Sequence, residues 1–169
     1  MRKNEIYKKV IDFKRRYPTT IAWRLRAHSK LAEELINNDE EVLYAFAAQK
    51  APNSFNILST FVFVLTDKRI VLAQKRLFYG YFYYSITPDM FNDLTLRMGM
   101  IWGKAVIDTV KEQVYLTNLS SGALREIETV LSKYMIQKKR ELEMGDSKDK
   151  KKVKNMEKEL KEIAKNGEK

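Results

Sequence analysis

Two short apolar runs with a charged turn between them lie near the middle of the chain, and they constrain its fold more than any other feature. The first run is Phe61–Leu65 and the second is Ile70–Leu72, with Thr-Asp-Lys-Arg between them. β-branched and aromatic residues favour extended strands, and Asp and Thr are suited to tight turns. The pattern therefore predicts a β-hairpin whose strands are strongly apolar.

The sequence before this hairpin has a helical period. Apolar residues recur three or four positions apart and predict a helix over residues 4–16, which Pro18 terminates because proline disfavours the helical conformation in the residue before it. Thr19 or Thr20 is expected to cap a second helix that runs to about Ile36. The two segments together predict an N-terminal helical hairpin.

From Glu41 the apolar period shortens to two residues, which is typical of strands. A first strand is expected from there to Ala47, and the apolar hairpin follows it. Further strands are expected on both sides of Gly80 and at residues 93–98, 104–110 and 113–117, with turns at Gly103 and Lys111-Glu112. Seven short strands at this spacing predict an α+β protein with a strongly curved antiparallel sheet or small barrel.

A long helix is expected after the last strand, capped by Ser120 or Ser121 and interrupted at Gly145-Asp146-Ser147. Its apolar face is formed by Leu124, Ile127, Leu131 and Tyr134. The predicted domain organisation is a basic helical hairpin over residues 1–37, a barrel with its capping helix over residues 38–143, and a charged tail over residues 144–169 that is either helical or disordered.

The net charge of +10 is concentrated at the ends of the chain, because residues 1–30 carry ten basic residues against two acidic ones. An attraction to an anionic surface would therefore act through the first helix. The basic side chains expected to make that contact are Lys8, Lys9, Lys14, Arg15 and Arg16. On a membrane, Ile6, Val10 and Phe13 would enter the lipid. The alternative is that this apolar stripe packs on the protein's own core.

Composition excludes several kinds of chemistry. The chain has no cysteine, so disulfides, zinc–thiolate sites and cysteine nucleophiles are excluded. His28 is the sole histidine and is interpreted as structural or solvated. Neither a metal-ligand cluster nor a glycine-rich phosphate loop is recognisable. We therefore expect no catalytic, cofactor or metal site, and a cytoplasmic protein without a secretory signal, for which membrane association is an alternative.

Several segments together carry a family resemblance. They are Glu41–Phe46, Phe63–Ile70, the region around Ile86, Gly103 in a turn, and an amphipathic helix at Ser121–Tyr134. Over roughly residues 30–137 the chain resembles the YokE-like bacterial pleckstrin-homology (PH) family, and Leu-Thr-Asp-Lys-Arg at 65–69 is the most specific element. The resemblance implies a half-open, seven-stranded antiparallel barrel with one end plugged by the C-terminal helix.

The resemblance does not extend to inositol phosphates. PH domains that bind phosphoinositides generally carry several basic residues in the loop between their first two strands. The corresponding loop here, residues 50–56, has Lys50 alone.

Two groups of residues are candidate binding sites. The aromatic residues after the apolar hairpin are expected to bind a partner, unless one of the helices covers them; they are Phe78, Tyr79, Tyr81, Phe82 and Tyr83. Lys68, Arg69, Lys75 and Arg76 could form an anion site if the two pairs lie close together. The alternative for Asp67 and Arg69 is turn chemistry, in which Asp67 binds local backbone N–H groups and Arg69 pairs with an acid on a neighbouring strand.

These observations favour a non-enzymatic binding module that recruits a protein partner, or associates with itself, through an aromatic strand edge. A peripheral membrane module that uses the basic first helix is the alternative. A nucleic-acid-associated protein comes third, because no DNA-reading motif is recognisable.

Overall fold

The computed structural model describes residues 4–50 and 57–166. The chain forms two compact units, Met1–Ser132 and Lys133–Lys169. In chain order the elements are α1 (Glu5–Arg16), α2 (Leu25–Leu35), β1 (Val42–Gln49), the 3-10 turn η1 (Ile57–Ser59), β2 (Thr60–Thr66), β3 (Ile70–Lys75), β4 (Tyr81–Ile86), η2 (Pro88–Met90), β5 (Phe91–Met98), β6 (Trp102–Thr109), β7 (Gln113–Ser120), η3 (Ser121–Ala123) and α3 (Leu124–Asn166).

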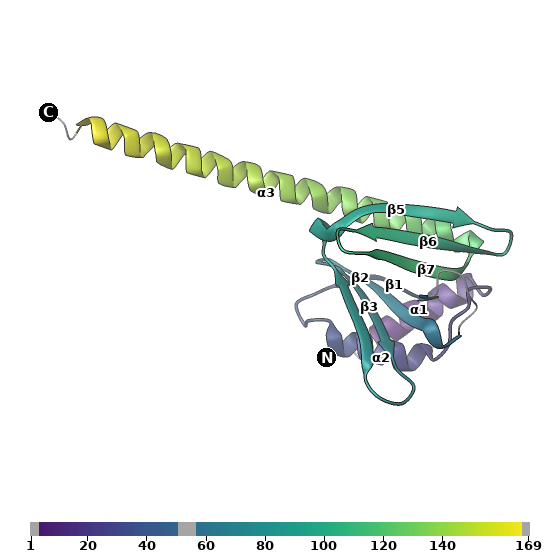
Figure 1. The fold of residues 1–169 in the computed structure, drawn as a ribbon. Helices are drawn as coiled ribbons and strands as arrows, with labels where there is room; N and C mark the ends of the chain where they lie inside the picture. Colours follow the sequence, from purple (N-terminus) through teal and green to yellow (C-terminus); the bar gives the residue numbers. More distant parts are fainter. Residues whose placement is uncertain (1–3, 51–56, 167–169) are drawn as a thin grey trace. The chain divides into compact units, whose positions relative to one another are not determined.

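The strands form one antiparallel sheet in the order β4-β3-β2-β1-β7-β6-β5 (Figure 1). Neighbouring strands pair over most of their length, except that β1 and β7 meet only at Gln49 and Thr117. The sheet is therefore a half-open barrel, and β4 and β5 are its two edges. This confirms the α+β fold with seven strands, two N-terminal helices and a C-terminal capping helix.

The inner face of the sheet holds the main core. Residues on this face are fully buried in β1, β2, β6 and β7, for example Phe46, Phe63 and Leu116. The first turns of α3 plug the barrel with Leu124 and Ile127, which are 0% exposed. The predicted role of this helix face is therefore confirmed.

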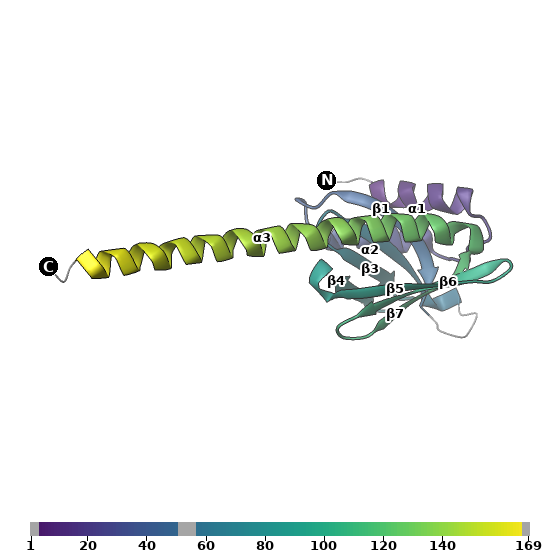
Figure 2. The same cartoon turned by 90° about the horizontal axis from the view of Figure 1, so that it is seen from above.

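The outer face of β1–β3 is covered by α1 and α2, as the two views show (Figures 1 and 2). Apolar residues of both helices pack there against Ala45, Ala47, Val62, Val64, Val71 and Ala73. The Glu33 carboxylate near the end of α2 accepts hydrogen bonds from the backbone N–H groups of Asn4 and Ile6, so the helices run as a hairpin. Because β2 has cover on both faces, every one of its residues is buried, which explains its unbroken apolar sequence.

The second helix begins later than the sequence predicts. The backbone N–H of Ile21 donates to the carbonyl oxygen of Asn118 at 2.8 Å, and that of Trp23 donates to Thr60 Oγ1 at 3.2 Å. These residues are tied to the sheet, so α2 starts only at Leu25. Thr20 is buried and accepts a hydrogen bond from the Ser120 backbone, so neither Thr19 nor Thr20 caps the helix.

The prediction of a turn at Gly103 is wrong. Gly103 lies inside β6, opposite Met98 and beside a register shift, and the turn precedes it. A Cβ atom at this position would lie 2.5 Å from Leu124 Cδ1 and 2.7 Å from the Arg97 carbonyl oxygen. Glycine is required here because the first turn of α3 packs directly on the strand.

The start and the course of the last helix also differ from expectation. Neither Ser120 nor Ser121 caps it; a 3-10 turn precedes α3, and Ser121 Oγ donates instead to the Gly99 carbonyl oxygen at 2.7 Å. The helix continues without interruption through Gly145 to Asn166. Residues 144–166 of the predicted tail lie in this helix. The domain boundaries drawn from the sequence stay a prediction.

Candidate functional site

The tip of the β3–β4 hairpin is an exposed apolar surface. Phe78 is 86% exposed and Tyr79 is 90% exposed, and Leu77 and Tyr81 beside them are about half exposed. Gly80 closes the turn with a φ of 75°, a left-handed conformation that glycine adopts without strain. The Arg76 backbone N–H donates to the Gly80 carbonyl oxygen at 3.2 Å. We call Leu77, Phe78, Tyr79 and Tyr81 the aromatic tip.

The other two residues of the predicted aromatic surface are partly covered. Tyr83 packs against the cluster under α1 and α2, and its hydroxyl accepts a hydrogen bond from Arg69. Phe82 lies on the opposite face, with the Lys50 ammonium 3.6 Å from its ring centroid. The predicted surface is therefore divided between the exposed tip and two half-buried side chains. The rest of the loop that holds Lys50, residues 51–56, lies outside the described residues.

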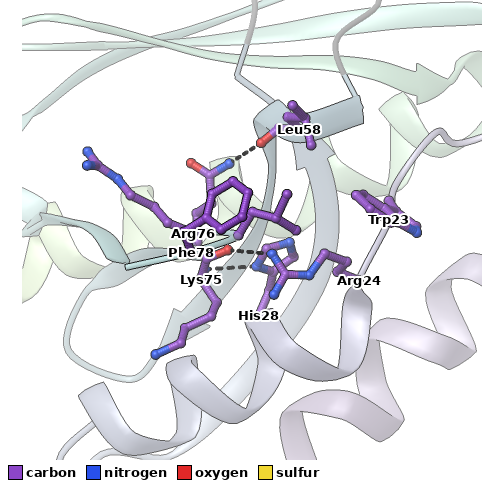
Figure 3. Close-up of a pocket in the computed structure, with 9 residues that line it drawn as sticks. Trp23, Arg24, His28, Leu58, Lys75, Arg76 and Phe78 are labelled. Carbon is purple, nitrogen blue, oxygen red and sulfur yellow. Dashed lines mark hydrogen bonds between the residues drawn. The ribbon is translucent and has the colours of Figure 1, made fainter. Parts of the chain in front are cut away.

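A cavity of about 350 Å³ lies beside the tip (Figure 3). It is lined by Trp23, Arg24, His28, Leu58, Gln74, Lys75, Arg76, Leu77 and Phe78. The sequence singled out Lys75, Arg76 and Phe78 as site residues but did not place Trp23, Arg24 or Leu58 with them. Those residues come from the α1–α2 connection and from η1, and no local pattern links these segments to the β3–β4 hairpin.

His28 fixes the geometry of one wall of this cavity. Its ring is only 3% exposed, and Nδ1 accepts a hydrogen bond from the Lys75 backbone N–H at 2.9 Å. Arg24 Nη1 donates to the carbonyl oxygen of the same residue at 3.2 Å, so α2 holds the end of β3 (Figure 3). Burial, together with the charge of Arg24, lowers the pKa of His28 to about 4. The imidazole is therefore neutral near pH 7.

We expect the folded protein to lose stability as the pH falls from 6.5, the ordinary pKa of histidine, to about 4. In that window the unfolded chain binds a proton at His28 that the folded chain does not bind, so a falling pH favours unfolding. The slope from this group reaches at most about 1.4 kcal/mol per pH unit and fades over about one pH unit above 6.5. Urea unfolding at a series of pH values measures this dependence of the unfolding free energy on pH.

The control for this measurement is His28→Asn, because its side-chain oxygen can still accept from the Lys75 N–H but does not titrate. We expect a shallower pH dependence in the variant. Equal slopes in both proteins would contradict the assignment to His28.

The four basic residues of the predicted anion site do not form one patch. Lys68 and Arg69 lie at the turn between β2 and β3, and Lys75 and Arg76 lie at the opposite end of β3. A strand of this length separates its ends by roughly 20 Å. The Lys68 ammonium also pairs with Asp39.

Arg69 is engaged in a buried network. Its Nη2 donates to Glu40 Oε1 at 2.7 Å, and Glu40 is only 1% exposed. Thr66 Oγ1 also donates to this carboxylate, at 2.9 Å. Burial by itself would raise the pKa of Glu40, but the hydrogen bonds from Arg69 and Thr66 outweigh it and hold the pKa below its usual value. Thr66 and Arg69, both in the segment 65–69 that carries the family resemblance, therefore join the β2–β3 hairpin to Glu40 before β1.

The neighbouring Asp67 binds a backbone segment outside its own turn, and not the local N–H groups that the sequence suggested. Its carboxylate accepts a hydrogen bond from the Glu41 backbone N–H at 2.7 Å, and its own N–H donates to the Glu41 carbonyl oxygen. Asp67 and Arg69 both make structural contacts, but the Asp67 partner is distant in sequence and the acid that pairs with Arg69 precedes β1 instead of lying on a strand.

The apolar stripe of α1 is not available to a membrane in this fold. Ile6, Val10 and Phe13 are at most 1% exposed, so of the two alternatives for this stripe, packing on the protein's own core is the one observed. The stripe covers the outer face of β1, and Phe13 also stacks on Phe46. Two of the five predicted cations are also engaged: Lys14 donates to backbone carbonyl oxygens of Pro18 and Thr20, and Arg16 pairs with Glu126.

Glu126 in the first turn of α3 receives two further hydrogen bonds, from the hydroxyls of Tyr17 and Tyr44 at 2.7 Å each. Burial would raise its pKa, but the donors Arg16, Tyr17 and Tyr44 outweigh burial and hold the pKa below its usual value. The carboxylate stays ionised and joins α1 and β1 to α3.

Lys8, Lys9 and Arg15 remain at or near the surface of α1, and Arg15 lies 3.7 Å from Asp12. Within the described residues, no three His, Asp or Glu side chains come together as metal ligands. None of the described helices combines the length and the apolar character that a membrane crossing requires.

A half-open, seven-stranded antiparallel barrel plugged by a C-terminal helix defines a PH-like domain. The family model described as bacterial PH domain matches residues 36–164. The chain therefore belongs to the bacterial PH domain family.

A solved structure is similar in fold to this chain. It is the crystal structure of a DUF1696 family protein with a pleckstrin-homology domain from Shewanella loihica, at 15% identity and a TM-score of 0.44. The similarity covers 64% of this chain and 92% of that protein. The curated proteins searched gave no match.

Proposed function

We propose that this protein is a non-enzymatic binding module that recruits a protein partner through the aromatic tip and the adjoining edge of β4. The observation that carries the proposal is the exposure of Phe78 and Tyr79, at 86% and 90%. Large apolar side chains that project from a hairpin turn contribute little to the core. Exposed aromatic clusters are typical of protein interfaces.

The sheet supports the same surface. β4 is an edge strand, and among the described residues no backbone hydrogen bond reaches its outer side. An unpaired edge can accept a strand from another protein or from a second copy of this chain. Tyr81 lies at the point where the tip continues into this edge.

Replacement of Tyr79 and Tyr81 by Ser is expected to abolish capture of the partner while leaving the fold intact, because Tyr79 is 90% exposed and Tyr81 about half exposed. The measurement is an affinity pull-down from native lysate, with light scattering to separate self-association from a different partner. Met100→Ser is the matched control, because Met100 is 98% exposed at the β5–β6 turn. Unchanged partners and unchanged mass in the tyrosine variant would remove the tip from the interface.

Contact with an anionic membrane is a second proposal, and in this fold it depends on charge alone. Lys8, Lys9 and Arg15 are the predicted cations that remain at or near the surface. Basic residues near an anionic bilayer contribute about 1 kcal/mol each. Flotation with phosphatidylserine liposomes tests this proposal. The double variant Lys8→Glu, Arg15→Glu should no longer bind the liposomes. If the wild-type protein does not bind anionic liposomes either, the proposal is ruled out.

A further inference from the structure

The cavity beside the aromatic tip carries a positive charge that its own lining does not neutralise. Its charged side chains are Arg24, Lys75 and Arg76, and no carboxylate lines it. Lys75 and Arg76 are exposed, and within the described part of the chain none of the three basic side chains forms an ion pair. Uncompensated cations around a concavity attract a ligand that bears carboxylates.

The remaining walls are apolar. Trp23 from the α1–α2 connection, Leu58 from η1 and Phe78 from the tip all line the cavity and are exposed (Figure 3). A volume of about 350 Å³ is at the small end of the range for ligand pockets, roughly 300–1,000 Å³. The cavity therefore suits one apolar side chain with its immediate neighbours, and not a whole folded surface.

The buried ring of His28 completes the lining. Because Nδ1 of His28 already accepts the Lys75 N–H, the proton of the neutral ring is on Nε2. Within the described residues Nε2–H has no hydrogen-bond partner, and His28 lines the cavity while being only 3% exposed. The hydrogen bond to Lys75 therefore fixes the ring that forms this part of the cavity wall.

We propose that this cavity binds an acidic peptide segment of the partner, with one aromatic or aliphatic side chain between Trp23 and Phe78 and flanking carboxylates at Arg24 and Arg76. The inference rests on the proposed function, because Phe78 belongs both to the aromatic tip and to the cavity wall. A peptide with carboxylates on both sides of one apolar side chain matches both the basic residues and the apolar walls of the cavity. A phosphate group alone would account only for the cations.

The test starts with selection of a short random-peptide library on the full-length protein. The enriched sequences should combine Asp or Glu with an aromatic or aliphatic residue. A synthetic copy of an enriched peptide should then bind in a fluorescence anisotropy titration, and its affinity should fall as the salt concentration rises.

Two variants with matched controls locate the binding. Arg76→Glu should weaken the selected peptide about ten-fold or more, whereas Arg97→Glu on β5 makes the same charge change at an exposed residue outside the cavity and should leave affinity within about two-fold. Phe78→Ser should weaken binding comparably, and Met100→Ser should not.

Three results would overturn the inference. The selection could yield no acidic, apolar sequences, or the selected peptides could bind equally well to the Arg76→Glu and Phe78→Ser variants. The third is displacement of the bound peptide by phosphatidylserine vesicles or by inorganic phosphate at equal anionic charge. The proposed function is tested separately, because Tyr79 and Tyr81 do not line the cavity. If the tyrosine variant loses partner capture and the peptide selection fails, the aromatic tip remains the proposed contact surface and the cavity is rejected as a peptide site.

Discussion

Replacement of Arg69 by Ala is expected to destabilise the protein by about 3–5 kcal/mol, the usual cost of removing one partner from a buried ion pair. The Glu40 side chain is 1% exposed, and its carboxylate would lose the guanidinium that donates to both of its oxygens. Arg69 also donates to the hydroxyl of Tyr83 on β4, so the variant loosens that edge strand as well. Urea unfolding measures the change.

The control for this prediction is Lys68→Ala. Lys68 pairs with Asp39 on the surface, where ion pairs contribute little because water screens them. We expect almost no change in the midpoint of unfolding. The penalty in Arg69→Ala should also shrink as the pH falls toward and through the usual range for Glu, because burial without the Arg69 partner raises the pKa of Glu40 and lets it take up a proton. Equal stability of the two variants near pH 7 would contradict the structural role of Arg69.

Phe46→Ala is expected to have an effect of similar size, about 3–5 kcal/mol, through the cavity it leaves. Phe46 is 0% exposed and stacks between Phe13 of α1 and Phe63 of β2, with ring centroids 5.1 and 4.6 Å away. The substitution therefore weakens both the barrel core and the attachment of α1. Denaturant unfolding followed by far-UV circular dichroism measures it.

Phe78→Ala is the matched control, because it removes the same atoms from a side chain that is 86% exposed. Its effect should stay within about 0.5 kcal/mol. A loss of stability at Phe78 comparable with that at Phe46 would mean that the tip is part of the folded core, and the proposed contact surface would then be wrong.

The fold was predictable from the sequence where local patterns dominate. The apolar runs Phe61–Leu65 and Ile70–Leu72 predict the β2–β3 hairpin, and the structure confirms it. The stripe of α1 predicts a helix and the residues that it buries, and both are observed. What this stripe packs against is a tertiary property, so the sequence left protein core and lipid as alternatives.

The errors have a common cause, which is contact between segments far apart in the chain. Gly103 resembles a turn glycine in sequence, but Leu124 packs on it from another element. Thr20 resembles a helix cap, but Ser120 occupies its hydroxyl oxygen. The start of a helix and the position of a turn depend in these cases on partners about 20 or 100 residues away.

The candidate site was predictable only in part for the same reason. The aromatic run around Tyr79 is visible in the sequence because it is continuous. The cavity is assembled from three segments, and Trp23, Leu58 and Arg76 come together only after the N-terminal hairpin has packed on the sheet. The separation of Lys68 from Arg76 likewise follows from the direction of β3.

The most direct test of the proposed role is photo-crosslinking from the aromatic tip in cells. A photo-reactive phenylalanine at Tyr79 is compared with the same group at Met100, which is equally exposed on a different hairpin. We predict a specific crosslinked species, another protein or a second copy of this chain, from position 79 and not from position 100. Crosslinks from position 100 alone, or no crosslinked protein from position 79, would contradict the assignment of the aromatic tip as the contact surface.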